Sequence, residues 1–127
     1  RQIEDDEVIF KSPGKDYLGN PEAIFSIYGY QSKGALFMDI FFPEVLESLQ
    51  TQNGKLLQHG EIKIDELVSN WILFRYNDPK WIIWTFYVID DFNRLTKIQM
   101  MTKPDDFDKY RPVFEKFKDS VKFKKVF

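Results

Sequence analysis

The side chains of this sequence that could do chemistry are few, and they are scattered along the chain. The only histidine is His59, in the segment Gln58-His59-Gly60, and there is no cysteine. One imidazole without a second histidine or a thiolate makes a poor metal site, so we expect His59 to be an ordinary surface residue in a turn. The absence of cysteine excludes disulfides, thiolate ligands and cysteine nucleophiles.

Ser120 and three groups of carboxylates are the remaining candidates. Ser120 lacks the Gly-X-Ser-X-Gly context of a hydrolase nucleophile, and we expect it at a helix-to-strand junction. The acidic groups lack the Gly and the distant Glu of a calcium loop. We therefore read Glu4-Asp5-Asp6-Glu7 as a solvated run, Asp90-Asp91 with Asn93 as a turn, and Asp105-Asp106-Asp108 as a helix start.

The sequence shows no combination of a nucleophile, a general base and an orienting group, and it shows no set of metal ligands. We therefore expect a protein that is not an enzyme and that uses no metal or cofactor. The expected function is binding or assembly through protein–protein contacts.

Charge is distributed unevenly although the net charge is only −2. Residues 1–66 carry six Lys and Arg against twelve Asp and Glu, and residues 67–127 carry twelve against eight. Either the two halves fold onto each other with complementary charges, or the second half presents a basic surface. A pI near 5.4 argues against nucleic acid as the partner. The candidate interaction surface consists of five lysines: Lys116, Lys118, Lys122, Lys124 and Lys125.

Length and composition predict one domain over residues 1–127 with a core of its own. Hydrophobic residues make up 43% of the chain, including thirteen Phe, six Tyr and three Trp. No apolar run approaches the roughly 20 residues of a membrane-spanning helix. The chain opens on Arg1 rather than Met, which fits either an artificial start or the removal of a targeting segment. On the second reading we expect an extracytoplasmic location, in the periplasm or at the cell surface.

Hydrophobic periodicity and turn formers predict strands first, then a helix, four more strands and a last helix. Pro43 is expected to stop a strand and to precede a helix that begins at Glu44 and stops near Asn53-Gly54. Helices over a mainly antiparallel sheet define an α+β fold. The predicted strands are 7–12, 23–30, 35–42, 61–65, 70–76, 81–89 and 95–101.

The last helix is predicted over 105–119, with an aromatic stripe on one face. Pro112 is costly inside a helix but is tolerated in a first turn, so the regular helix is expected to start near Arg111. Bulky residues on both faces of 81–89 predict a central strand that is covered on both sides. They fill the core or, alternatively, line a ligand cavity. Asp39 lies in an apolar run, where its carboxylate must reach water or a partner.

The final sixty or so residues resemble the PsbP-like family, which is named for an extrinsic photosystem II protein and extends to bacterial lipoproteins and a Ran-binding nuclear-import factor. Val121 departs from the aromatic residue usual after the serine. The matching segments are Trp71–Tyr76, Trp81–Ile89, Leu95–Met101, Tyr110-Arg111-Pro112-Val113-Phe114 and Asp119-Ser120-Val121-Lys122-Phe123, with Phe10-Lys11-Ser12-Pro13 less specific.

This resemblance implies an α-β-α sandwich and a role in assembly or protein binding, with no shared catalytic residues to carry over. Two alternatives remain open. The aromatic surplus would suit a carrier of a lipid or another small apolar ligand, and the acidic first half would suit an immunity protein against a basic toxin.

Overall fold

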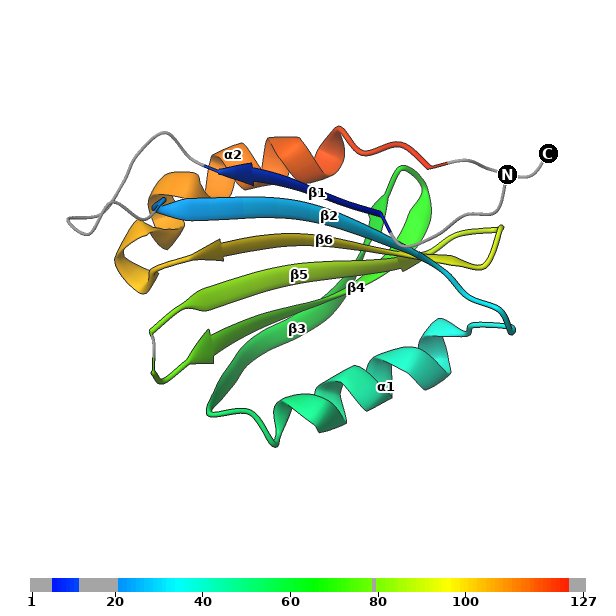
Figure 1. Cartoon of the computed structure of the whole chain (residues 1–127), viewed down its shortest axis with the longest axis horizontal. Helices are drawn as coiled ribbons and strands as arrows, with labels where there is room; N and C mark the ends of the chain where they lie inside the picture. Colours follow the sequence, from blue (N-terminus) through cyan, green and yellow to red (C-terminus); the bar gives the residue numbers. More distant parts are fainter. Residues whose placement is uncertain (1–5, 12–20, 79, 124–127) are drawn as a thin grey trace.

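The computed structural model describes residues 6–11, 21–78 and 80–123, and it shows a twisted sheet with one helix against each face (Figure 1). In the first stretch it describes the strand but not the side chains. The elements, in chain order, are β1 (Asp6–Lys11), β2 (Ala23–Gln31), α1 (Met38–Leu49), β3 (Gly54–Ile64), β4 (Leu67–Tyr76), β5 (Ile82–Ile89), β6 (Arg94–Thr102), the 3₁₀ turn η1 (Pro104–Asp106) and α2 (Phe107–Asp119).

All neighbouring strands in the sheet are antiparallel, in the order β1-β2-β6-β5-β4-β3. The predicted meander from β4 to β6 is confirmed, and each of its turns joins adjacent strands. β2 pairs with β6, a strand distant in the sequence, from Ala23 opposite Thr102 to Gln31 opposite Arg94. The α+β fold with an antiparallel sheet covered by helices is therefore confirmed.

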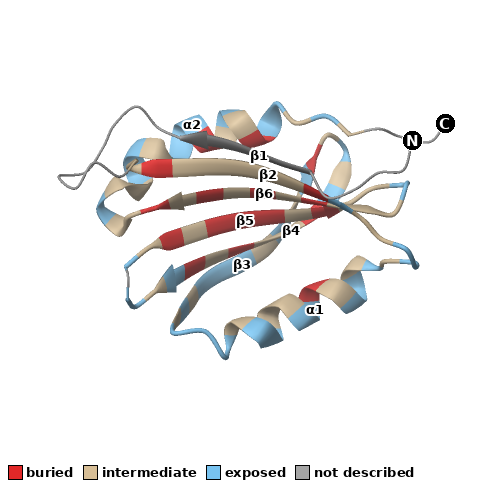
Figure 2. Ribbon diagram, in the orientation of Figure 1, coloured by how far each residue is buried: buried red, intermediate tan, exposed pale blue. Residues whose placement is uncertain are grey.

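The helices build separate hydrophobic layers because side chains alternate across the sheet. On β4, Trp71 and Leu73 pack in the α2 layer, whereas Ile72 and Phe74 pack in the α1 layer. Buried residues concentrate on β5 and β6, and β3 is mostly exposed (Figure 2). The buried centre of the α2 layer is Ile64, Trp84, Phe86, Val88, Ile98, Met100 and Phe114.

The first helix corrects the sequence prediction for residues 35–42. They are not a strand: 35–37 are irregular, and α1 begins at Met38 and includes Pro43. Without an N–H, Pro43 cannot bond the carbonyl of Asp39, but that residue is exposed and its carbonyl can turn to water. Asp39 lies in the first helical turn, where a carboxylate favours the positive end of the helix dipole.

The last helix runs continuously from Phe107, so the predicted start near Arg111 is wrong. η1 occupies 104–106 and leads directly into the helix. Pro112 is exposed, and packing of the aromatic stripe outweighs its missing hydrogen bond. Within the described residues, Ser120 is the helix C-cap, and no strand follows it.

The third strand is longer than the predicted 61–65, because it begins at Gly54. Its first half is an exposed sheet edge with a bulge between Leu56 and Gln58, which hides the alternation of a half-buried strand. His59 therefore lies in β3 opposite Ile72, not in a turn. Among the described residues, no helix is long and apolar enough to cross a membrane.

Candidate functional site

A groove of about 350 Å³, the α1 groove, lies between the first half of α1 and the β3–β4 hairpin. The helix closes one side because Phe42 turns inward, where its ring lies 6.2 Å from that of Tyr87. Val68 lines the hairpin side and stays 44% exposed. Asp39 and Glu61 supply charge, and none of the lining residues is cationic. The lining consists of Met38, Asp39, Phe42, Pro43, Glu61, Val68 and Asn70.

Two large apolar side chains that adjoin groove residues in the sequence remain in water. Phe37 is 58% exposed and Ile40 is 60% exposed, and they adjoin Met38 and Asp39 in the sequence. The helix buries Phe42 and packs Leu46 and Leu49 against the sheet, so residues on its other sides have no partner layer. We call the groove together with Phe37 and Ile40 the α1 surface.

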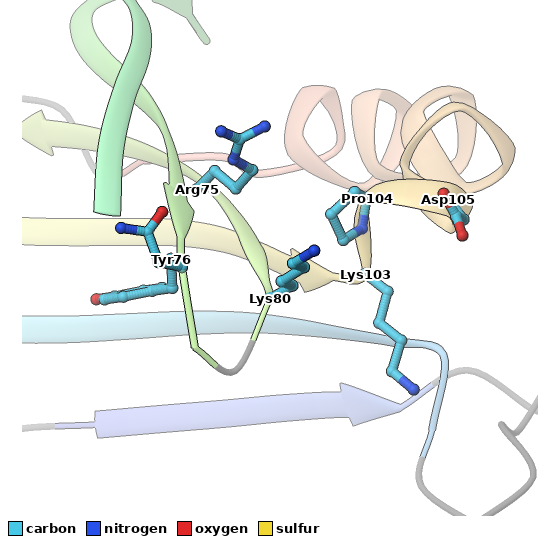
Figure 3. A pocket seen from close by; sticks show the side chains of 7 residues that line it. Arg75, Tyr76, Lys80, Lys103, Pro104 and Asp105 are labelled. Atoms are coloured by element: carbon cyan, nitrogen blue, oxygen red, sulfur yellow. The ribbon is translucent and has the colours of Figure 1, made fainter. Parts of the chain in front are cut away.

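A second hollow, the sheet-end pocket, has a volume of about 570 Å³ and lies between the end of β4, the turn that follows it, and η1 with the preceding Lys103. Its charged residues are the cations Arg75, Lys80 and Lys103 and one carboxylate, Asp105 (Figure 3). Tyr76, Asn77 and Pro104 complete the lining. In Figure 1 the turn between β4 and β5 lies at the opposite end of the sheet from the start of α1.

The lysines proposed from sequence do not form one exposed patch in the described residues. Lys116 is exposed, but Lys118 is 8% exposed, and its ammonium lies 4.8 Å from the centre of the Phe86 ring. Lys122 lies 3.8 Å from the Asp65 carboxylate. Lys124 and Lys125 lie outside the described residues. Binding by this region stays a prediction.

The structure also places the histidine and the acidic groups that the sequence singled out. The His59 ring lies 6.3 Å from that of Phe42. The Asp90 carboxylate accepts hydrogen bonds from the amides of Phe92 (2.9 Å) and Arg94 (3.1 Å), which confirms the predicted turn. Within the described stretches, no group of three or more His, Asp or Glu side chains is arranged to hold a metal. In the acidic run at residues 4–7, Glu4 and Asp5 lie outside the described residues, and Asp6 and Glu7 begin β1.

Sequence reasoning missed two residues that tie distant segments together. Asn93, at φ 59°, accepts a hydrogen bond from the Leu36 amide (2.6 Å) and donates one to the Gly34 carbonyl. Glu22 accepts hydrogen bonds from Lys109 (2.9 Å) and Tyr110 (2.6 Å), and its carboxylate raises the pKa of Lys109. An Asn after a pair of aspartates was the available signal for the first, since Asn tolerates left-handed backbone. No local signal marks Glu22.

No protein-family model and no curated protein sequence matches the chain. The chain does match solved structures in its fold. The fold is similar to that of PA94 from Pseudomonas aeruginosa, a protein of unknown function that has been suggested to be a regulator. The TM-score is 0.83 at 16% identity, covering 98% of this chain and 88% of that one.

The fold is also similar to that of CyanoP, the PsbP protein of the cyanobacterium Synechocystis sp. PCC 6803. Here the TM-score is 0.53 at 13% identity, with 86% of this chain and 76% of that one covered. Identities this low show a shared fold alone. The resemblance to PsbP-like proteins is therefore confirmed at the level of the fold.

Proposed function

We propose that this chain is a non-enzymatic binding domain that recognises a segment of a protein partner through the α1 surface. The observation that carries the proposal is the α1 groove, in which Met38, Phe42 and the partly exposed Val68 offer apolar surface. Phe37 and Ile40, which are exposed, adjoin its lining residues in the sequence. Scattered apolar residues are normal on a surface, whereas apolar residues gathered at a groove with a polar rim are typical of protein-binding sites.

The charges of the groove define the partner further. Asp39 and Glu61 line it and no cation does, so the complementary segment carries an apolar anchor beside Lys or Arg. The anchor fills the space between Phe42 and Val68, and the basic residue reaches the carboxylates at the rim. Two exposed carboxylates add specificity more than affinity.

An immunity protein against a basic toxin is the second candidate, because Asp39 and Glu61 belong to the acidic half of the chain. It requires the same charge complementarity. It differs from the first candidate in the partner, which must be a toxin whose activity the chain inhibits.

The test is capture of a partner from the native organism, followed by affinity measurements on the purified pair. Ile40→Ser combined with Val68→Thr removes exposed apolar groups without opening the core. Loss of a central apolar anchor costs more than about 1 kcal/mol, so we expect binding to weaken by about fivefold or more. Val113→Ser is the matched control, since Val113 is 53% exposed on α2 and should leave affinity unchanged.

Two results would overturn the proposal. One is equal loss of affinity in the control and in the α1 variants. The other is turnover of a defined substrate by a protein that captures no specific partner. Inhibition of a captured toxin would instead select the immunity function.

A further inference from the structure

The sheet-end pocket gathers cations from three segments that are separate in the sequence. Arg75 is the penultimate residue of β4, Lys80 lies in the turn before β5, and Lys103 follows β6. Strand pairing brings them together, because Arg75 lies opposite Ile82 and Ile82 lies opposite Thr102. Two strand spacings place Arg75 about 10 Å from Thr102, next to Lys103.

Cations outnumber carboxylates among the residues that line this pocket. Three cations and one carboxylate line it, and Lys103 has an interaction partner of its own. Neither Arg75 nor Lys80 forms an ion pair with any residue that the structure describes. Two other exposed cations in the same half of the chain do have carboxylate partners, Arg111 with Glu115 and Lys109 with Glu22.

The orientation of the side chains supports one anion-binding side. Figure 3 shows the guanidinium of Arg75 and the ammonium of Lys80 on the same side of the strand ends, while Lys103 extends to the other side. Asp105 lies beyond Pro104, away from both Arg75 and Lys80. An anion between Arg75 and Lys80 would meet two cations before it meets the carboxylate.

Phosphate suits this arrangement better than a single carboxylate does. Arginine offers a planar fork that binds two oxygens at once, and lysine adds a compact charge. A phosphate monoester carries about −1.5 to −2 at neutral pH, which matches the two positive charges of Arg75 and Lys80. A volume of about 570 Å³ also leaves room for a larger body, for which Tyr76 and Pro104 offer apolar surface.

We propose that the sheet-end pocket binds a phosphate-bearing small molecule, with Arg75 and Lys80 holding the phosphate. This site lies at the other end of the sheet from the α1 surface and does not depend on the function proposed for that surface. The phosphate belongs either to a soluble compound or to a lipid headgroup.

The test uses two probes on the full chain. Inorganic pyrophosphate is titrated into ¹⁵N-labelled protein, with the amide signals followed by NMR. Vesicles of phosphatidylcholine with and without phosphatidic acid are tested by co-sedimentation. We expect pyrophosphate to shift signals around Arg75, Lys80 and Lys103 first, and added salt to weaken the binding. Sedimentation with phosphatidic acid in the absence of a pyrophosphate effect would support the headgroup as the source.

Two double variants decide whether the pocket or the net charge of the protein is responsible for phosphate binding. Arg75→Gln with Lys80→Gln removes two charged hydrogen-bond donors and should weaken binding about tenfold or more. Lys33→Gln with Lys116→Gln removes the same charge from exposed sites outside the pocket and should change affinity less than about twofold. Equal weakening in both double variants overturns the proposal. So does failure of wild-type protein to bind either probe at millimolar phosphate.

Discussion

Phe114 belongs to the buried centre of the α2 layer. It is fully buried, and its ring lies 5.4 Å from Phe25, 5.5 Å from Trp84 and 6.0 Å from Phe86. Phe114→Ala leaves a cavity among these rings, so we expect the free energy of unfolding to fall by about 3–5 kcal/mol. Urea denaturation followed by tryptophan fluorescence measures this.

The adjacent Val113 is the control for that prediction, because it belongs to the same helix but is 53% exposed. Val113→Ala should change the free energy of unfolding by at most about 0.5 kcal/mol. Equal destabilisation by the two variants would mean that α2 is held by its helical propensity and not by the buried rings.

Tyr87 makes stability depend on alkaline pH. Burial raises its pKa from 10.0 to about 12, with a contribution from Tyr76. Because the folded-state pKa is the higher one, this contribution to stability is complete below pH 10 and is lost as the pH rises through 12. Over that window, the unfolding free energy of wild-type protein should fall by about 2–3 kcal/mol more than that of Tyr87→Phe.

The phenylalanine variant keeps the ring contacts with Phe41 and Phe42 and removes only the titrating hydroxyl. Titration of the tyrosinate absorbance against pH provides an independent check. One ionisation at high pH, that of Tyr87, should be missing from the variant. Identical pH profiles for the two proteins would show that Tyr87 ionises in the folded state as freely as in the unfolded state.

The contacts of individual side chains were the hardest feature to predict from sequence. The helical spacing of Phe107, Phe114 and Phe117 predicted a buried stripe, and these residues pack in the α2 layer. The same spacing could not show that Lys118 is buried with its charge over Phe86, because a long side chain can fold back onto a ring that the sheet supplies. The pocket cations were equally hidden, since only strand pairing joins Arg75 to Lys103.

At the scale of elements, predictions succeeded where the periodic signal was strong. Strands β4 to β6 are rich in β-branched and aromatic residues and are separated by turn formers, and their positions were predicted to within a few residues. The start of α1 was missed because 35–42 contain strand-forming residues and Pro43 resembles a stop. The helix forms nonetheless, since packing of Phe42, Val45 and Leu46 on the sheet outweighs local propensity.

Gly54 controls how closely β3 can pair with β4 at its first residue. A Cβ there would lie 2.6 Å from the Phe74 ring and would also collide with the backbone carbonyl of Arg75. The carbonyl cannot move without opening the strand pair. We expect Gly54→Ala to lower the free energy of unfolding by about 1–3 kcal/mol, measured by urea denaturation.

Gly34 offers the matched substitution, because a Cβ there meets no atom within 4 Å. Gly34→Ala should be neutral or stabilising by up to about 1 kcal/mol through the reduced entropy of the unfolded chain. Similar losses at both glycines would argue that helix α1 and its leading loop, rather than the β3–β4 contact, respond to the added methyl group.

At the scale of the whole molecule, the two helical layers share their strands. β4 contributes Ile72 and Phe74 to the α1 layer and Trp71 and Leu73 to the α2 layer. The sequence indicated this sharing through bulky residues on both faces of 81–89. It could not indicate that β2 pairs with β6, because contacts between residues about 70 positions apart leave no local pattern.

Shared strands predict that the chain unfolds as one unit. Phe42→Ala weakens the α1 layer and Phe114→Ala the α2 layer, whereas two of the three tryptophans, Trp71 and Trp84, report from the α2 side. In both variants, the transitions seen by tryptophan fluorescence and by far-UV circular dichroism should coincide at a lowered denaturant midpoint. If Phe42→Ala instead loses helical signal while the fluorescence midpoint stays at the wild-type value, the α1 layer is a separate unit. The sheet would then be stable with α2 alone.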